Sequence, residues 1–379
     1  MAGSSVGIVE LAYEGHRPLH IALIAPPWYP MPPRGYGGIE LVVILLAREL
    51  RRQGHNVTLF GAEGSERGTT ICAPAGLDVH LGQDTQVLHE MTYLSRVEQM
   101  IRELGPFDVI SDHSGFGGAL ITSLLDAPTP VLHTFHGRIG ASELEFLASL
   151  RTSGGFIAIS DSQRRSAPRL QWAGVVHNAV DVNSLYVLAA DRDPRYLLCL
   201  ARVCEEKGQD VAIEVARRCG LRLILAGKTE QTPISRAFFR RRIEPFIDGT
   251  HVLYVPNVTG AIKASLIARA TAMLAPICWP EPFGLSVVEA MVSGTPAVSF
   301  RQGSATELIE PGITGFVVDD LQEMVDAVAC ARDVDPFHCA RVARDRFNPQ
   351  VMTGSYLRLY QRALLARPAA RGAVDRLTA

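Results

Sequence analysis

Short aliphatic and β-branched runs alternate along the chain with longer segments in which apolar residues recur at helical spacing. The first run covers residues 20–25 and ends at two prolines, so it predicts a strand. Residues 39–52 then carry apolar side chains three and four positions apart, which predicts an amphipathic helix closed by Gly54. A second aliphatic run over residues 56–60 completes a strand-helix-strand unit.

The same alternation continues through both halves of the chain, with a polar interruption at residues 181–194. Further strands are predicted at residues 107–111, 131–135, 155–160, 196–200, 222–226, 252–255, 272–276 and 297–300, and further helices at 88–104, 209–219, 260–270 and 336–366. Alternating strands and helices form parallel sheets covered on both faces. We therefore expect an α/β protein with two Rossmann-like doubly wound domains facing each other across a cleft. The expected domains are residues 1–185 and 186–360, followed by a frayed tail at 361–379.

Composition supports a globular protein with more than one core. The chain has 379 residues, of which 47% are hydrophobic and 20% charged, and this length exceeds that of one ordinary domain. The net charge of −2 gives no field that would attract nucleic acid. No apolar run approaches the roughly 18 residues of a transmembrane span, and residues 1–16 lack the pattern of a secretory signal. The cysteines are dispersed, so we expect reduced thiols in a cytoplasmic protein, without a zinc site.

The most informative segment is residues 280–291, which read PEPFGLSVVEAM. Glu281 lies in a loop that two prolines keep from being helical, and Gly284 lets the backbone approach a ligand. The amides at the start of the following helix favour a phosphate. Glu289 lies about a turn and a half into that helix and can accept two hydrogen bonds from a vicinal diol. The segment therefore combines a diphosphate cradle, a ribose clamp and a second carboxylate for a sugar.

Cations follow two predicted strands of the second half. Arg202 and Lys207 lie in one loop that leads into a helix, where both can reach one diphosphate and stabilise the charge on a leaving group. Two ordinary surface cations are the alternative, which the acidic segment downstream disfavours. Lys228 follows the next strand and is either a further phosphate contact or a surface lysine. The only other lysine in the sequence is Lys263.

These motifs resemble those of the retaining family 4 glycosyltransferases of the GT-B fold. The resemblance rests on RVCEEKG at residues 202–208, on the segment 281–289 and on SGTPAV at residues 293–298, and it extends to residues 37–40, 178–181, 303–307 and 312–316. It implies transfer of a hexose from a nucleotide-diphosphate sugar to an acceptor hydroxyl with the anomeric configuration kept. It also implies that no metal or other cofactor is needed, that the first domain binds the acceptor and that the second binds the donor.

By this resemblance the second domain supplies most of the donor site. Arg202 and Lys207 would hold the diphosphate. Glu289 would bind the ribose hydroxyls, and Glu281 the hydroxyls of the donor sugar. Further donor contacts are assigned to Gly37, Gly38, Lys228, Phe283, Gly284 and Leu285. Gly38 would bring a backbone amide to the phosphate from the first domain, and its alternative role is that of a simple turn glycine. The expected catalytic set is Arg202, Lys207, Glu281 and His136.

The acceptor side is assigned mainly to the first domain. His136 ends a predicted strand and matches the family histidine beside the reacting sugar, with a structural histidine as the alternative. Asp112 and His113 also end a strand, and they either contact the acceptor or form a satisfied pair in their loop. Tyr36 and Trp279 either contact a sugar ring or pack their own loops.

Two positions depart from the family pattern, since Ala179 and Pro256 stand where glycine is usual. Neither removes a charge from the expected site, so we expect an active enzyme. The resemblance implies a same-face displacement in which the leaving phosphate helps to deprotonate the acceptor hydroxyl. The chain offers no convincing candidate for a dedicated nucleophile.

Other classes fit the sequence less well. A nicotinamide dehydrogenase would carry a G-x-G-x-x-G turn, which the loop after the first strand lacks. A metal-dependent transferase would use an Asp-x-Asp pair, and residues 191–193 and 333–335 have that spacing but lie in the linker and near the last helices. A sugar-nucleotide epimerase, a sugar phosphorylase and a non-catalytic nucleotide-sugar binder stay open on the same fold.

The sequence does not identify the ligands. UDP-glucose and GDP-mannose are the leading donors, and the acceptor is a carbohydrate, a lipid or a small molecule. A lipid acceptor would bring the protein into peripheral contact with a membrane surface.

Overall fold

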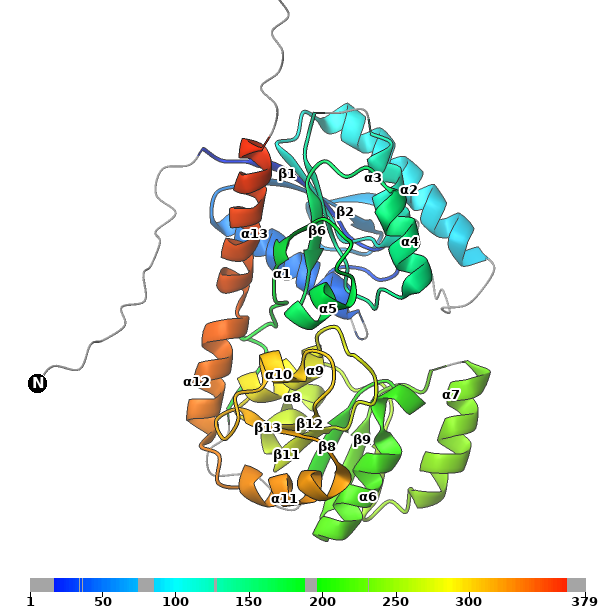
Figure 1. Ribbon diagram of the computed structural model, residues 1–379, viewed down its shortest axis with the longest axis vertical. Coiled ribbons are helices and arrows are strands. Elements are labelled where there is room, and N and C mark those ends of the chain that lie inside the picture. The colour runs from blue at the N-terminus through cyan, green and yellow to red at the C-terminus, as the bar shows by residue number, and fades with distance from the viewer. Residues whose placement is uncertain are drawn as a thin grey trace, which may run out of the picture.

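The computed structural model describes residues 17–33, 35, 37–73, 85–125, 128–187, 196–230 and 232–366. They form two α/β domains, drawn one above the other in Figure 1. Each domain is built on one sheet in which all neighbouring strands run parallel, with helices packed around it. The expectation of two Rossmann-like domains is therefore confirmed.

The first sheet has the strand order β3-β2-β1-β4-β5-β6-β7. Its strands are β1 (His20–Ile24), β2 (Asn56–Ala62), β3 (Thr69–Ala73), β4 (Val109–Asp112), β5 (Val131–Thr134), β6 (Gly155–Ala158) and β7 (Trp172–Val175). Its helices are α1 (Gly38–Arg52), α2 (Thr85–Leu104), α3 (Phe116–Ser123), α4 (Ala141–Ser149) and α5 (Asp161–Ser166).

The second sheet has the strand order β10-β9-β8-β11-β12-β13. Its strands are β8 (Tyr196–Leu200), β9 (Arg222–Ala226), β10 (Val252–Val255), β11 (Ala272–Ala275), β12 (Ala297–Phe300) and β13 (Gly315–Val318). Its helices are α6 (Gln209–Cys219), α7 (Pro233–Phe238), α8 (Gly260–Arg269), α9 (Leu285–Val292), α10 (Ala305–Leu308), α11 (Leu321–Ala331) and α12 (Pro336–Phe347). Short helical turns cover Glu205–Lys207, Phe239–Ile243 and Glu244–Phe246.

The strand order reverses between β1 and β4 in the first sheet and between β8 and β11 in the second. Open α/β sheets bind ligands at such points, beyond the carboxyl ends of the strands. The loop with Arg202 and Lys207 follows β8, and the loop with Glu281 follows β11. The topology therefore brings these two loops to the same edge of the second sheet.

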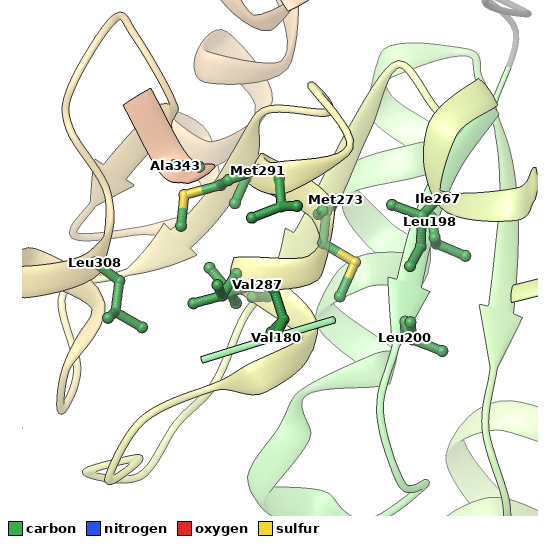
Figure 2. Close-up of a cluster of buried hydrophobic side chains, with 14 of the residues drawn as sticks. Val180, Leu198, Leu200, Ile267, Met273, Val287, Met291, Leu308 and Ala343 are labelled. Carbon is green, nitrogen blue, oxygen red and sulfur yellow. The ribbon is translucent and has the colours of Figure 1, made fainter. Parts of the chain in front are cut away.

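The core of the second domain fixes helix α9. Val287 and Met291 of α9 share one hydrophobic cluster with Leu198 and Leu200 of β8 and with Met273 of β11, as Figure 2 shows. All residues of α9 from 287 to 292 are buried. Close packing of this kind leaves the helix little room to shift. The core therefore determines where the N-terminus of α9 and the carboxylate on this helix are held.

The last two helices pack on different domains. Helix α12 contributes to the core of the second domain, whereas α13 (Pro349–Leu365) packs on the core of the first. The sequence pattern predicts that both complete the second domain and that residues 361–379 fray. Instead, residues 361–365 continue α13, because Tyr356 and Tyr360 are fully buried against the first domain. An amphipathic pattern reveals an apolar face but not which core will cover it. Residues 367–379 lie outside the described part.

The chain crosses between the domains at two adjacent points. Ala179 belongs to the core of the first domain and Val180 to that of the second. The chain returns after Phe347, at the junction of α12 and α13. The amide of Val180 donates to the carbonyl oxygen of Phe347 at 3.1 Å, and the amide of Ala179 donates to Sδ of Met352 at 3.2 Å. The two crossings are therefore bonded to each other, a few residues before the predicted boundary at residue 185.

Candidate active site

Lys207 and Glu281 form an ion pair across the two loops that follow β8 and β11. Their side chains are only 12% and 17% exposed. The Lys207 ammonium also lies 5.5 Å from the ring centroid of Trp279, within cation–π range. The structure thus brings together the cation assigned to the diphosphate and the carboxylate assigned to the donor sugar, with Trp279 beside them.

Gly208 allows the loops after β8 and β11 to approach each other closely. Gly208 has a φ of 65° and closes the turn that carries Lys207. A Cβ at this position would lie 2.1 Å from the carbonyl oxygen of Pro276, in the loop after β11. The amide of Cys278 donates to the carbonyl of Glu206 at 3.0 Å and joins the same two loops. Only glycine permits so close an approach with a left-handed backbone.

Arg202 and Lys228 lie close together in a second cationic group of this domain. Arg202 forms an ion pair with Glu230, whose other carboxylate oxygen accepts a hydrogen bond from Ser235. Burial lowers the pKa of Lys228, and the positive charge of Arg202 lowers it further, while Glu230 opposes both. Proximity of two cations destabilises both unless an anion lies between them. Glu230 supplies that anion for these two cations in this structure.

Glu289 is buried in helix α9 and forms an ion pair with Lys263 of α8 at 2.6 Å. The sequence motifs assign no role to Lys263. The only sequence signal was the scarcity of lysine, because nothing in the local pattern links α8 to α9. Each of the two glutamates in the segment 281–289 therefore forms an ion pair with a different lysine.

The glycines at the start of α1 meet the second domain. A Cβ on Gly38 would lie 2.9 Å from Cδ1 of Leu285, the first residue of α9. Leu285 packs against the cores of both domains. The N-termini of α1 and α9 therefore face each other, and the absence of a side chain at Gly38 makes room for the side chain of Leu285 between them. Tyr36 lies outside the described residues.

Buried His113 and half-buried His136 form a pair at the ends of β4 and β5. Nδ1 of His113 lies 2.9 Å from Nε2 of His136, and their rings stack with centroids 5.2 Å apart. Burial lowers the pKa of His113 well below its ordinary value, and the neighbouring His136 lowers it further. Burial also lowers the pKa of His136, to about 4, although Asp112 opposes the shift. Both rings are therefore neutral near pH 7.

Asp112 has internal partners at both carboxylate oxygens. Oδ1 accepts hydrogen bonds from the amide and the hydroxyl of Ser114, and Oδ2 lies 3.0 Å from Nδ1 of His133. The Asp112 side chain is 1% exposed. Asp112 is therefore satisfied by Ser114 and by His133 of β5 and not by His113, and its contact with an acceptor stays a prediction.

A carboxylate of the second domain accepts hydrogen bonds from the N-terminus of a helix of the first domain. Glu307 of α10 accepts hydrogen bonds from the amides of Asp161 and Ser162, at the start of α5, at 2.7 and 2.5 Å. Nε2 of His177 lies 3.5 Å from the same carboxylate. Burial alone would raise the pKa of Glu307, but the hydrogen bonds from His177 and the two amides outweigh it, so the pKa is lowered. We call this contact the Glu307 clasp.

The Glu307 clasp should make stability depend on pH. Since the folded state lowers the pKa of Glu307, the clasp contributes fully above the ordinary carboxyl pKa and is lost as the pH falls through the folded value. We expect Glu307→Ala to reduce the free energy of unfolding by about 2 kcal/mol at pH 7, because two helix amides lose their acceptor. Thermal unfolding at several pH values measures this effect.

Glu323→Ala is the matched control. Its carboxylate also accepts a backbone amide, that of Asp319, but within one domain and on an exposed helix. We expect it to change the unfolding midpoint less than Glu307→Ala does. Equal shifts in the two variants at pH 7 would show that the clasp adds nothing between the domains.

In the Asp-x-Asp pattern at residues 333–335, the second aspartate has a structural role. Asp335 caps helix α12 by accepting hydrogen bonds from the amides of Phe337 and His338. Residues 191–193 lie outside the described part. Within the described ranges, no cluster of three or more His, Cys, Asp or Glu side chains is arranged to hold a metal ion. Within the same ranges, no helix is both long and apolar enough to cross a bilayer.

Comparison with known proteins agrees with this arrangement. Residues 36–184 match the family model described as glycosyltransferase family 4, and residues 186–331 match the model described as glycosyl transferases group 1. A phosphatidyl-myo-inositol mannosyltransferase of Mycolicibacterium smegmatis is 26% identical over 90% of this chain and 94% of its own. A D-inositol 3-phosphate glycosyltransferase of the same organism is 22% identical over 96% of this chain and 97% of its own.

Solved structures share the fold. AviGT4, a glycosyltransferase involved in avilamycin A biosynthesis, has a TM-score of 0.70 and 28% identity over 92% of this chain and 99% of its own. Anabaena HepE in complex with UDP-glucose also has a TM-score of 0.70, with 17% identity over 91% of this chain and 100% of its own. With both halves of the chain matched by glycosyltransferase models and this fold shared, the chain belongs to the family 4 glycosyltransferases of the GT-B fold.

Proposed function

We propose that this glycosyltransferase moves a hexose from a nucleotide-diphosphate sugar to an acceptor hydroxyl and retains the anomeric configuration. The ion pair between Lys207 and Glu281 is the observation that supports the proposal most. It holds a cation suited to a diphosphate directly beside a carboxylate suited to the hydroxyls of a sugar. In a complex with the donor, the diphosphate would replace Glu281 as the counter-charge of Lys207, and the sugar hydroxyls would donate hydrogen bonds to Glu281.

Departure of the nucleoside diphosphate leaves the sugar carbon cationic and the phosphate oxygen more negative. Lys207, Arg202 and the amides at the start of α9 stabilise that oxygen, which is the role of fixed donors in transition-state stabilisation. These charges belong to the chain itself, which supports a reaction without a metal ion. The departing phosphate accepts the proton of the acceptor hydroxyl on the same face of the sugar. Neutral His136 would approach the donor from the first domain and hydrogen-bond the reacting sugar or the acceptor.

Glu289 and its neighbours would select the rest of the donor. The buried carboxylate accepts hydrogen bonds from the ribose hydroxyls, with Lys263 fixing its orientation. We propose UDP-glucose and GDP-mannose as the donors to test, since one relative is named a mannosyltransferase and one structural neighbour holds UDP-glucose. The acceptor is a carbohydrate, a lipid or a small molecule, and a lipid would require contact with a membrane surface. We propose a cytoplasmic location.

One experiment separates this function from its rivals. The full chain is incubated with each donor and a panel of acceptor alcohols, with and without EDTA, and the products are followed by NMR. We expect a glycoside with the donor's anomeric configuration, formed equally well in EDTA. Inverted product, an epimerised donor, or turnover that requires inorganic phosphate would each reject the proposal. A rise of the unfolding midpoint with nucleotide, but no transfer to any acceptor, would indicate a binding protein.

A further inference from the structure

A pocket opens beside His136 at the carboxyl ends of strands β4 and β5. Its empty volume is about 420 Å³, part of which is open to solvent. The loops after β1, β4 and β5 and the first turn of α1 form its walls. Under the proposed function, an acceptor that is bound in this pocket is in contact with His136.

Most of the pocket wall is apolar. It is formed by Pro26, Trp28, Ile39, Phe116 and Phe135. Phe116 is 37% exposed, and its ring lies 5.2 Å from that of Phe135. An exposed aromatic side chain at a pocket gains stabilisation when an apolar ligand covers it. The wall therefore favours a ligand with an apolar ring.

Few polar side chains of the wall remain available to a ligand. The hydroxyl of Ser114 donates to Asp112, and both ring nitrogens of His113 have partners in Ser111 and His136. Arg138, in contrast, is exposed and forms no ion pair with any residue that the structure describes. Among the described side chains of the pocket, His136, Arg138 and the indole N–H of Trp28 can bind polar groups of an acceptor.

We infer that the acceptor is an alcohol with an apolar ring and one anionic group. The reacting hydroxyl would lie at His136, the ring against Phe116 and the anion at Arg138. A polyol such as an inositol would bury more hydroxyls than these three side chains can pair, and each unpaired hydroxyl would weaken binding by roughly tenfold. The inference rests on the proposed function and specifies its acceptor.

Three matched alcohols test it: para-hydroxymethylbenzoate, benzyl alcohol and an inositol phosphate. The first has the ring, the hydroxyl and the anion, while the second lacks the anion and the third lacks the apolar ring. With the donor that the protein uses, we expect kcat/KM for para-hydroxymethylbenzoate to exceed each of the others by about tenfold. Arg138→Gln should lower transfer to para-hydroxymethylbenzoate by a larger factor than it lowers transfer to benzyl alcohol, which removes the advantage of the carboxylate. Phe116→Ala should lower transfer to both benzyl compounds.

The outcomes separate the acceptor from the function. A preference for the inositol phosphate would overturn the inferred acceptor and leave the proposed transfer intact. So would an Arg138→Gln variant that lowers transfer to both benzyl alcohols by the same factor. If the protein transfers sugar to none of the three nor to any other alcohol, the proposed function fails and the inferred acceptor with it.

A separate chain of hydrogen bonds leads from the last helix to His136. The Tyr360 hydroxyl, on α13, donates to Oγ of Ser111 at 2.8 Å. Oγ of Ser111 lies 3.3 Å from Nε2 of His113, and Nδ1 of His113 lies 2.9 Å from Nε2 of His136. Tyr360, Ser111 and His113 are each at most 1% exposed, so no water competes with these contacts.

The direction of donation along this series of hydrogen bonds selects one tautomer of His136. Because Ser111 accepts from Tyr360, its own proton is available to Nε2 of His113. The proton of neutral His113 then lies on Nδ1 and is donated to Nε2 of His136. His136 is left with its proton on Nδ1. We propose that Tyr360 is a positioning residue that fixes His136 in this tautomer for the reaction.

Tyr360→Phe tests this role, with Tyr356→Phe as the matched control. Both phenols are fully buried on α13, but the hydroxyl of Tyr356 bonds to Thr134 and lies outside the chain to His136. NMR of the imidazole nitrogens should show a mixture of His136 tautomers in Tyr360→Phe and the wild-type tautomer in Tyr356→Phe. We expect kcat to fall about tenfold in Tyr360→Phe alone, with the donor KM unchanged.

A single His136 tautomer in Tyr360→Phe would overturn this positioning role, whatever the activity. So would equal losses of kcat in the two phenylalanine variants, because these would reflect the packing of α13. The NMR result does not depend on the reaction, so it stands even if the proposed function is rejected.

Discussion

Replacement of Lys207 by alanine is expected to lower kcat by about 100-fold or more. In the proposed reaction the Lys207 ammonium stabilises the oxygen of the departing diphosphate, whose negative charge grows in the transition state. Loss of one such fixed donor costs about 3 kcal/mol of transition-state stabilisation. The measurement is nucleotide release at saturating donor and acceptor, with kcat and KM determined separately. Arg202→Ala should show a loss of the same kind.

Lys263→Ala is the control for this prediction. Both lysines are partly buried and paired with a glutamate of the segment 281–289. Lys263 orients the carboxylate assigned to the ribose, which binds the ground state and the transition state alike. Its loss should therefore raise the donor KM more than it lowers kcat. Unchanged turnover in both Lys207→Ala and Arg202→Ala would refute the role given to these cations.

Gly208→Ala is expected to destabilise the protein and to abolish most of its activity. The new Cβ would lie 2.1 Å from the Pro276 carbonyl oxygen, and φ at this position is 65°. The loops after β8 and β11 would have to separate, which would pull Lys207 away from Glu281. We expect a loss of more than about 3 kcal/mol in the free energy of unfolding, since steric overlap adds to the strain of a left-handed alanine.

Gly220→Ala separates these two effects. Gly220 has a φ of 64°, but nothing lies within 4 Å of the Cβ position. It should therefore show the backbone strain alone, about 1 kcal/mol, with normal activity. The unfolding midpoints of both variants and their rates of nucleotide release give the comparison. If the two glycine variants lose the same stability, the close approach to Pro276 is not important for folding.

Most elements of the fold were predictable because their signals are local, but strands β3, β7 and β13 have no counterpart among the predicted strands. Alternating runs of residues indicated the strands, and each loop of the proposed donor site follows directly on one of them. A parallel sheet gathers the ends of its strands at one edge, so the convergence of Lys207 and Glu281 follows from their positions after β8 and β11. The roles assigned to these residues as ligands of a donor remain predictions.

The relations between distant segments were not predictable in this way. Lys263 meets Glu289 only because α8 packs beside α9, and Glu307 meets α5 only because the two domains dock. The apolar face of α13 is visible in the sequence, but the sequence does not say that it covers the first core. Each of these contacts depends on how finished elements pack, and one sequence taken by itself carries no signal for that packing.

The paired crossings at Ala179–Val180 and after Phe347 limit how the cleft can open. Both covalent links between the domains pass through one bonded joint. Motion of one domain against the other is therefore reduced to a swing about that joint, in which displacement grows with distance from it. Arg346 donates to the carbonyl oxygen of Glu307, so the Glu307 clasp lies next to the joint and would travel little. Substrates would enter on the side away from the joint. The contacts beside the joint would keep the two domains aligned when they close.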